Sequence, residues 1–201
     1  MTLYLVRHGT TSWNEEGRFQ GWSDVPLNGT GRQQSHWLGQ RLQSVPLDAV
    51  YASDLQRAVE TAAIIRDYLA GPPPLITDER LRESRFGQWE GLTSQEIARR
   101  FPLEWEKHRQ GWHVPGGESL AEVEARLRRF SEDLFAQPWK AVLVVAHGAL
   151  IRSWLTIILG MDLSFRRHFA VENGSLSKVK AKGLADPHAR VIRWNETAAG
   201  K

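Results

Sequence analysis

Two short apolar stretches, each ending in a His-Gly pair, constrain the fold of this chain more than any other feature. The first covers 2–6 and continues into Arg7-His8-Gly9, and the second covers 141–146 and continues into His147-Gly148. Apolar, partly β-branched runs of this length predict strands buried on both faces, as in parallel sheets covered by helices. Ligands of such sheets bind beyond the carboxyl ends of the strands, so the polar residues after each run are candidates for a functional site.

The turn after the first stretch has the composition of an anion site. Gly9 allows a tight turn and close approach of a ligand, and residues 10–12 add hydroxyl groups and backbone amides. The second His-Gly pair can face the same anion from another side, with helix-terminal amides behind it. For Arg7 and His8 taken alone, an ordinary strand end with a surface arginine and a hydrogen-bonded histidine is the competing interpretation.

Length and composition narrow the class of protein. A chain of 201 residues fits one α/β domain over 1–196, followed by a frayed tail over 197–201. The absence of cysteine excludes a disulfide framework and a zinc-thiolate site. The net charge of +3 is spread without a block of like charge, which favours a small anionic substrate over nucleic acid. The most apolar segment, 149–161, is short and contains Arg152, so it predicts a buried helix and no membrane span.

A further cation lies near the start of a predicted helix. The strand predicted over 48–53 ends in Ser53, which stands in capping-box spacing with Gln56, so we expect a helix that begins at Ser53. Arg57 then falls in the first helical turn, where the helix dipole disfavours a cation unless an anion compensates. A solvent-exposed arginine is an equally good interpretation from the residues alone.

The remainder of the chain alternates predicted helices and strands. Three helices have recognisable N-caps, namely Asn28, Thr93 with Glu96, and Ser119 with Glu122. We also expect a short strand at 75–76, a short helix over 104–111, and closing strands over 171–180 and 189–194.

The stretch LVRHGTTSWNEEGRFQGWSDVPLNGTG, residues 5–31, resembles the opening of the histidine phosphatase superfamily, the phosphoglycerate-mutase-like enzymes. Matching motifs recur in the family's order as far as Leu176, including SDLQRA at 53–58 and the segment 81–91. The resemblance implies an α/β fold of the family's kind, a three-layer αβα sandwich with a mostly parallel central sheet flanked by helices.

The resemblance also implies a set of site residues. His8 is the expected nucleophile, which attacks phosphorus and forms a phosphohistidine, and Glu83 is the expected acid and base. The residues expected to bind the phosphate, with no metal and no cofactor, are Arg7, Arg57 and His147. Further contacts with the phosphate or the substrate are expected from Asn14, Gln20, Gly21 and Gly148.

Two choices in the segment 81–91 bear on the chemistry. Glu90 competes with Glu83 for the acid/base role, but the alignment of the motif favours Glu83 and makes Glu90 a structural partner. Phe86 stands where mutase members of the family commonly carry a tyrosine, which removes a hydroxyl group from the pocket wall.

These features favour a metal-independent phosphatase that hydrolyses small-molecule phosphate monoesters through a phosphohistidine. The alternatives are a cofactor-dependent phosphoglycerate mutase and a pathway-specific phosphatase such as an α-ribazole phosphatase. A mutase must keep water from the phosphohistidine, and the interval from Glu83 to His147 leaves little chain for a lid. A metal hydrolase built on His8 and His147 lacks an evident third ligand motif. An inactive phospholigand-binding module would be expected to lack one of the chemical residues.

Partners and localisation follow from the same features. We expect a small phosphorylated metabolite as the partner, with no nucleic acid and no membrane, while a homodimer stays open. Only two residues precede the first predicted strand, too few for a secretory signal, so we expect a cytoplasmic protein.

Overall fold

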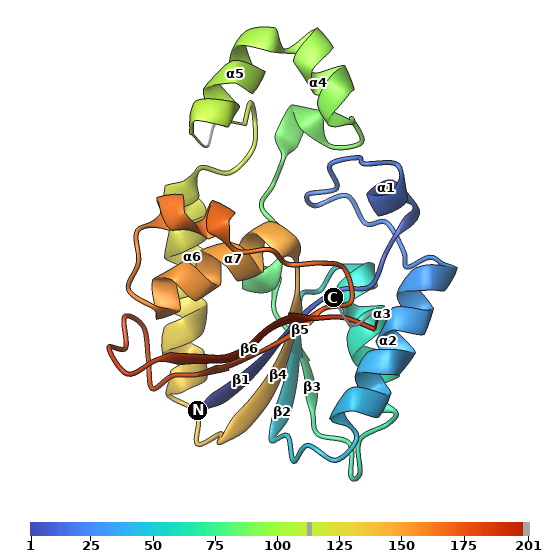
Figure 1. The fold of residues 1–201 in the computed structure, drawn as a ribbon, viewed down its shortest axis with the longest axis vertical. Helices are drawn as coiled ribbons and strands as arrows, with labels where there is room; N and C mark the ends of the chain where they lie inside the picture. The colour runs from blue at the N-terminus through green and yellow to red at the C-terminus, as the bar shows by residue number, and fades with distance from the viewer. Residues whose placement is uncertain (112–113, 199–201) are drawn as a thin grey trace.

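The computed structural model describes residues 1–111 and 114–198, which build a central sheet with helices on both faces (Figure 1). The sheet has six strands in the order β3-β2-β4-β1-β5-β6. The strands are β1 (Thr2–Arg7), β2 (Ala49–Ala52), β3 (Leu75–Thr77), β4 (Ala141–Ala146), β5 (Leu176–Lys180) and β6 (Arg190–Glu196). The helices are α1 (Ser12–Glu15), α2 (Gly29–Leu42), α3 (Gln56–Arg66), α4 (Ser94–Arg100), α5 (Pro102–Gln110), α6 (Leu120–Phe135) and α7 (Gly148–Ile158). Short 3-10 turns form η1 (Glu79–Leu81), η2 (Gly87–Trp89) and η3 (Leu163–His168).

The pairing of the central strands brings the two His-Gly pairs to one edge of the sheet. β1 and β4 are parallel neighbours, with Arg7 opposite Ala146, so the residues that follow both strands meet. The neighbouring β2 is also parallel to β4 and ends at the same edge. Three strand pairs are parallel, and the pairs β1 with β5 and β5 with β6 are antiparallel. The sheet is therefore mostly parallel, as the sequence predicts.

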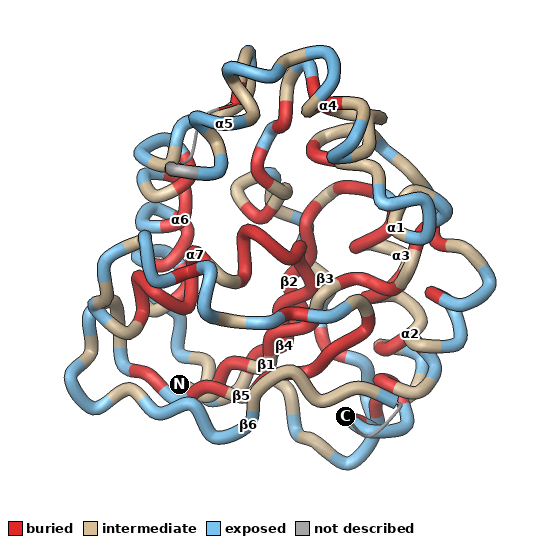
Figure 2. Tube along the Cα trace, turned by 45° about the horizontal axis from the view of Figure 1, so that its top comes forward, coloured by how far each residue is buried: buried red, intermediate tan, exposed pale blue. Residues whose placement is uncertain are grey.

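Apolar side chains fill both spaces between the sheet and its helices. On one face Leu5 packs in a cluster with side chains of α6 and α7, including Phe130 and Trp154. On the other face Val6 packs in a cluster with side chains of α2 and α3, including Leu38. Figure 2 shows the buried residues concentrated along the central strands and the exposed residues at the periphery. Burying one of these apolar side chains stabilises the fold by roughly 1.5–3 kcal/mol relative to leaving it exposed. The predicted α/β sandwich is confirmed.

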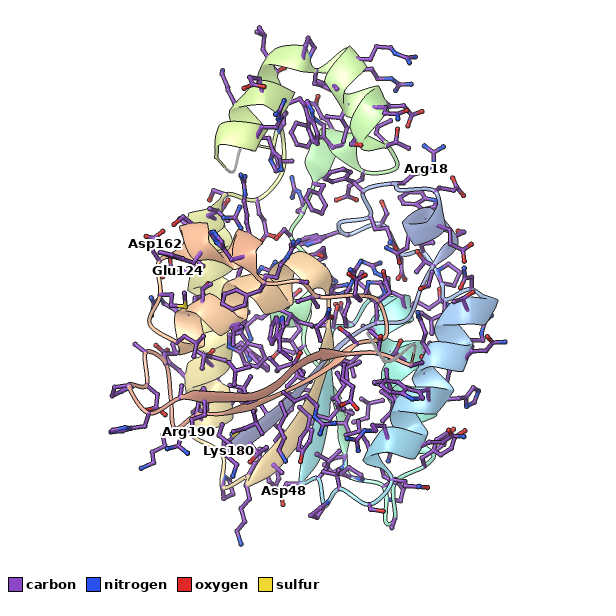
Figure 3. All side chains as sticks on the ribbon, in the orientation of Figure 1. Arg18, Asp48, Glu124, Asp162, Lys180 and Arg190 are labelled. Carbon is purple, nitrogen blue, oxygen red and sulfur yellow. The ribbon has the colours of Figure 1, made fainter. Side chains whose placement is uncertain are left out.

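Helices α4 and α5 form an arm that extends beyond the carboxyl ends of the strands (Figure 1). The arm has a small core that includes Trp89 and Ile97. Arg18 fastens the arm to the loop after α1, because its Nη1 donates to the Gly91 carbonyl at 2.7 Å and to the Glu96 carboxylate at 3.0 Å. In Figure 3 Arg18 lies at this end of the molecule and Asp48 at the opposite end. Helices α4 and α5 are the two short helices that the sequence predicts between Glu83 and His147, with α5 beginning at Pro102.

Three of the predicted helix starts are confirmed. The Asn28 side chain accepts the Gly31 N–H at 2.9 Å at the start of α2. Reciprocal capping boxes begin α4 at Thr93 and α6 at Ser119. Each cap satisfies N–H groups that a helix leaves without an internal partner.

The predicted start of α3 at Ser53 is wrong. The helix begins at Gln56, Leu55 is its N-cap, and Ser53 only accepts the Leu55 N–H at 3.3 Å. Asp24, distant in sequence, accepts the Gln56 N–H at 2.7 Å. A carboxylate at the positive end of the helix dipole replaces the local cap that the capping-box spacing predicts.

The C-terminal part follows the predicted order of strands with shifted boundaries. β5 begins only at Leu176, because the preceding residues turn around the end of β1, where Gly174 donates its N–H to the Arg7 and His8 carbonyls at 3.1 Å. Of the predicted tail over 197–201, residues 199–201 lie outside the described residues. Within 1–111 and 114–198, no helix is both long enough and apolar enough to cross a membrane.

Candidate active site

A cavity of about 210 Å³ lies at the carboxyl ends of β1 and β4 and joins residues from distant parts of the chain. Of the residues predicted as nucleophile, acid and base, or phosphate-binding group, four line it, namely Arg7, His8, Arg57 and Glu83. Its other walls are Asn14, Gly17, Arg18, Phe19, Gln20, Gly21 and Phe86. In the described part of the chain, no group of three or more His, Cys, Asp or Glu side chains is arranged to hold a metal ion.

The His8 ring is oriented by the backbone of the next residue. Its Nδ1 lies 2.7 Å from the Gly9 carbonyl oxygen. A carbonyl oxygen can only accept, so Nδ1 carries the proton and Nε2 keeps its lone pair. Burial, then the charges of Arg57 and Arg7, lower the pKa of His8 well below its ordinary value, so the ring is neutral near pH 7. A phosphorus-attacking histidine needs an acceptor for the proton on its other ring nitrogen, and the sequence alone does not show that the Gly9 carbonyl fills this role.

Two arginines, Arg57 fully buried and Arg7 partly buried, flank His8 and keep unused donors. Arg7 donates from Nη1 to the Val171 carbonyl at 2.6 Å. Arg57 donates to the carbonyls of Ser23 and Gly21, both at 2.8 Å. The Nε atoms of both arginines are buried without a hydrogen-bond partner among the described residues. Burial lowers the pKa of both groups, that of Arg57 to about 10. Both guanidinium groups nevertheless stay cationic at neutral pH, and they are therefore suited to bind an anion.

His147 follows β4 and is fully buried beside His8. The two ring centroids are 5.0 Å apart. Neither ring nitrogen of His147 has a hydrogen-bond partner among the described residues. Burial, followed by the charge of Arg57, lowers the pKa of His147 well below its ordinary value. One ring nitrogen of the neutral imidazole carries a proton in either tautomer, so His147 holds an unused N–H donor.

Glu83 connects the cavity to the start of α7. Its carboxylate accepts the Ala149 and Leu150 N–H groups, both at 3.1 Å, and the Ser84 N–H at 2.9 Å. His147 is the N-cap of α7 but gives no side-chain cap, so Glu83 takes that place from outside the helix. These contacts fix the carboxylate in the wall of the cavity that His8 also lines.

The prediction that the turn at 9–12 offers its amides to an anion is wrong for residues 9 to 11, whose N–H groups donate to side chains of the protein. The Gly9 N–H donates to the Thr61 hydroxyl at 3.1 Å, and the Thr10 N–H donates to the Gln34 side chain at 2.8 Å. Gly9 is required for another reason, because a Cβ there would collide with the backbone of Gly31 in α2. The close approach at Gly9 is thus between this turn and α2, and not between the turn and a ligand. The donors that remain for a ligand beside His8 belong to side chains.

The four residues expected to contact the phosphate or substrate differ in their placement. Asn14 lines the cavity, and its Oδ1 accepts the Asn173 Nδ2–H at 3.1 Å. Gln20 also lines it and accepts the Thr11 hydroxyl at 3.1 Å. Gly148 is not among the cavity walls and instead packs against an arginine, since a Cβ there would lie 3.2 Å from Arg7 Cζ.

Glu90 organises the loop on which Gly21 lies. Its carboxylate accepts the N–H groups of Trp22, Ser23 and Phe86 at 3.0 to 3.1 Å, and the Ser23 hydroxyl at 2.7 Å. Gly21 has a φ of +53°, and a Cβ there would collide with this carboxylate. Glu90 therefore has the contacts of a structural partner, and Glu83 is the carboxylate in the cavity wall.

Sequence reasoning missed one buried ion pair next to the site, between Arg126 of α6 and Glu118. The Arg126 side chain donates to the Glu83 carbonyl at 3.1 Å and so holds the segment that carries this carboxylate. A signal was present in the sequence, because Arg126 lies three residues after Val123 and four before Phe130, which places a charged side chain on the apolar face of the helix.

The histidine phosphatase superfamily (branch 1) matches residues 3–197 of this chain, and the chain belongs to that superfamily. Phosphoserine phosphatase 1 of Hydrogenobacter thermophilus is 34% identical over 181 residues, which is 88% of this chain and 85% of that protein. The 2,3-bisphosphoglycerate-dependent phosphoglycerate mutase 2 of Gloeobacter violaceus is 38% identical over 161 residues, 76% of this chain and 73% of that protein.

Solved structures agree with this membership. The α-ribazole phosphatase of Shigella flexneri superposes with a TM-score of 0.86 at 27% identity, covering 98% of this chain and 96% of that one. A mycobacterial glucosyl-3-phosphoglycerate phosphatase superposes with a TM-score of 0.86 at 28% identity, covering 98% of this chain and 99% of that one. The predicted family, the fold and the enzyme class, a phosphoric monoester hydrolase of the histidine phosphatase type, are confirmed.

Proposed function

We propose that this chain hydrolyses phosphate monoesters of small metabolites by moving the phosphoryl group first to Nε2 of His8 and then to water. One observation carries the proposal. The neutral His8 ring presents an Nε2 lone pair beside three groups with unused buried donors, Arg7, Arg57 and His147. Such donors neutralise the non-bridging oxygens of a phosphate, whose charge otherwise repels a nucleophile.

In the first step Nε2 of His8 attacks phosphorus, and the bond from phosphorus to the ester oxygen breaks. The proton of His8 stays on Nδ1, which donates it to the Gly9 carbonyl and so keeps the ring oriented throughout. Glu83, in its acid form, gives a proton to the departing oxygen, which leaves as the free alcohol. The products are a phosphohistidine and the Glu83 carboxylate.

In the second step a water molecule attacks the phosphohistidine in the place that the alcohol has left. Glu83 takes a proton from this water, the bond from phosphorus to Nε2 breaks, and inorganic phosphate leaves. The enzyme returns to neutral His8 and protonated Glu83. Asn14, Gln20 and Gly21 border the substrate in this scheme, and Gly148 makes room for the Arg7 guanidinium.

The relatives support a small phosphorylated metabolite as the substrate. Two of them are phosphatases whose names specify phosphoserine and glucosyl-3-phosphoglycerate. We extend only the shared chemistry, a phosphate monoester of a small alcohol, to this chain.

A trapping experiment tests the proposal. Brief reaction with a phosphorus-labelled monoester and rapid quenching should leave an acid-labile, base-stable label on the protein. His8→Ala should lose both the label and phosphate release. The control is His36→Ala, because His36 is an exposed histidine of α2 that contacts Tyr68, and this variant should keep both. A label on serine or aspartate, or a label that survives in His8→Ala, would overturn the proposal.

A further inference from the structure

A second cavity, of about 420 Å³, lies next to the one that holds His8. The two cavities share Phe19 and Phe86 as walls. The second is also lined by Ala149, whose N–H donates to Glu83 at 3.1 Å. In the proposed reaction Glu83 protonates the departing oxygen, so the second cavity begins where the rest of the substrate must lie.

The charge of this second cavity is one-sided. Its described lining residues include four arginines, from α5, α7 and η3, and no carboxylate. These are Arg109, Arg152, Arg166 and Arg167. Cations gathered in a partly buried space repel one another and cost free energy, which an anion in the same space offsets.

Three of the four arginines make contacts that hold the cavity wall, and Arg166 is one of them, with Nη1 donating to the Leu163 carbonyl at 3.1 Å. Arg167 donates to the carbonyls of His108, Arg109 and Gly111 at 2.8 to 3.0 Å, and so fastens η3 to the end of α5. Arg109 forms an exposed pair with Glu106 at 3.6 Å. These contacts fix the wall of the cavity and occupy the side chains of Arg167 and Arg109.

Arg152 lies one turn into α7. Its Nε donates to the Gly148 carbonyl at 3.2 Å, and no ion pair of the described residues includes Arg152. An α-helix rises about 1.5 Å per residue, so Arg152 lies about 3 to 4.5 Å further along α7 than the Leu150 and Ala149 amides that hold Glu83.

Arg166 of η3 supplies a second charge at the same cavity. The residue is only 6% exposed. Burial, then the charges of Arg167 and Arg152, lower its pKa to about 10, so it stays cationic at neutral pH. A cation held in a buried position is more strongly attracted to an anion than one in bulk water.

We propose that Arg152 and Arg166 bind an anionic group of the substrate's alcohol part, so that this chain prefers phosphate monoesters of acidic alcohols. The anion is a carboxylate or a second phosphate, on the side of the ester oxygen that faces the second cavity. The inference rests on the proposed phosphatase function, since it assigns the second cavity to the leaving group.

Matched substrate pairs test the preference. In one pair 3-phosphoglycerate is compared with glycerol 3-phosphate, which replaces the carboxylate by a hydroxymethyl group. In the other, 1,3-propanediol bisphosphate is compared with 3-hydroxypropyl phosphate. We expect kcat/KM to favour the anionic member of at least one pair by about 10- to 100-fold. The pair with the larger ratio identifies the anion as carboxylate or phosphate.

Charge-removing variants connect the preference to the two arginines. Arg152→Gln and Arg166→Gln should each lower kcat/KM for the anionic substrate by about 10-fold or more. For the substrate whose alcohol part is uncharged, kcat/KM should change by less than about 3-fold, since that part forms no ion pair with either arginine. Arg152→Glu should turn the preference towards the neutral member. The control Arg32→Gln removes an arginine of α2 that pairs with Glu60 and should leave both substrates unchanged.

The outcomes separate this inference from the proposed function. Equal kcat/KM values within both pairs, or an equal loss for neutral and anionic substrates in the variants, would overturn the anion subsite while phosphate release persists. No phosphate release from any monoester would overturn the proposed function and the subsite together. Thermal unfolding of each variant checks that it is folded, and Arg152, which is partly exposed, keeps the test open if Arg166→Gln unfolds.

Discussion

Arg126 and Glu118 form a buried bidentate ion pair that holds the backbone around Glu83. The distances are 2.8 Å from Nε to Oε1 and 2.9 Å from Nη2 to Oε2. The two side chains are only 9% and 13% exposed. Arg126 also donates to the carbonyls of Arg80 at 2.6 Å, of Arg82 at 2.8 Å and of Glu83 at 3.1 Å. One arginine of α6 thus fixes the segment that carries the proposed acid and base.

The first prediction concerns the cost of breaking this pair. Arg126→Met should lower the free energy of unfolding by about 3–5 kcal/mol, because it leaves a buried carboxylate without its counter-ion. The double variant Glu118→Met with Arg126→Met should cost less than the sum of the two single variants. Urea unfolding measures both.

A control on the same helix separates burial from pairing. Arg128 pairs with Glu124 through a 2.6 Å contact but is 49% exposed. Arg128→Met should change the free energy of unfolding by less than about 1 kcal/mol. Additive single variants, or an Arg128→Met cost equal to that of Arg126→Met, would show that the buried pair does not act as a unit.

The parts of the fold that the sequence predicts are those set by local pattern. The apolar runs that become β1 and β4 end in His8 and His147, and parallel strands end at one edge of the sheet, so the meeting of these histidines follows from the sequence. The capping boxes at Thr93 and Ser119 are likewise local, because each helix supplies both partners of its own cap.

The parts that could not be predicted depend on contacts between distant segments. Asp24 caps α3 from a loop that precedes α2, and this overrides the capping signal at Ser53. The Gly9 amide is taken by Thr61 of α3, so the turn has no free amide there for an anion. Such contacts have no spacing rule in the sequence. Glu83 could be named only through the family resemblance, since its partners lie on α7, far along the chain.

The second prediction separates proton transfer by Glu83 from simple binding. Glu83→Gln keeps the size of the side chain, and its one amide oxygen can still accept N–H groups of the two oxygens' present partners, but its NH2 group cannot accept and it has no carboxylic acid proton to give. Release of an alkoxide leaving group should fall by about 10²- to 10⁴-fold, while an activated aryl phosphate should be spared at the phosphorylation step.

Pre-steady-state measurement of phosphorylation with an alkyl and a nitrophenyl ester reads this difference. Glu90→Gln is the matched comparison, because Glu90 holds the loop at Trp22 and Ser23 and is not among the cavity walls. Its effect should be the same for both esters. An equal loss for both esters in Glu83→Gln would make Glu83 a binding residue.

The third prediction follows from the two buried histidines. Burial and the nearby arginines lower the pKa of His8 and of His147 well below the ordinary value. Below about pH 6.5 the unfolded chain binds protons that the folded chain does not, so stability is complete above that pH and falls as the pH falls. Each histidine should therefore lower the free energy of unfolding as the pH falls from 7 to 5.

Urea unfolding at pH 7 and pH 5 measures this fall, and variants assign it. His147→Gln should reduce the difference between the two pH values, because one of the two buried imidazoles is gone. The exposed His36 is the control, and His36→Gln should keep the wild-type difference. A wild-type protein that is equally stable at both pH values would contradict the assignment.

The last prediction is that this enzyme releases phosphate to water more readily than it isomerises a phosphoglycerate. The arm of α4 and α5 reaches past the strand ends, but its paired cations Arg99 and Arg100 are exposed in the last turn of α4. Phe86 brings no hydroxyl to the wall, and the leaving alcohol vacates a cavity that water can enter. With 3-phosphoglycerate and a trace of 2,3-bisphosphoglycerate, we therefore expect phosphate to accumulate faster than 2-phosphoglycerate. Coupled assays of both products measure the ratio. Isomerisation that exceeded phosphate release by about 100-fold, a difference of about 2.7 kcal/mol between the barriers, would make the chain a mutase and Arg99 and Arg100 the first residues to substitute.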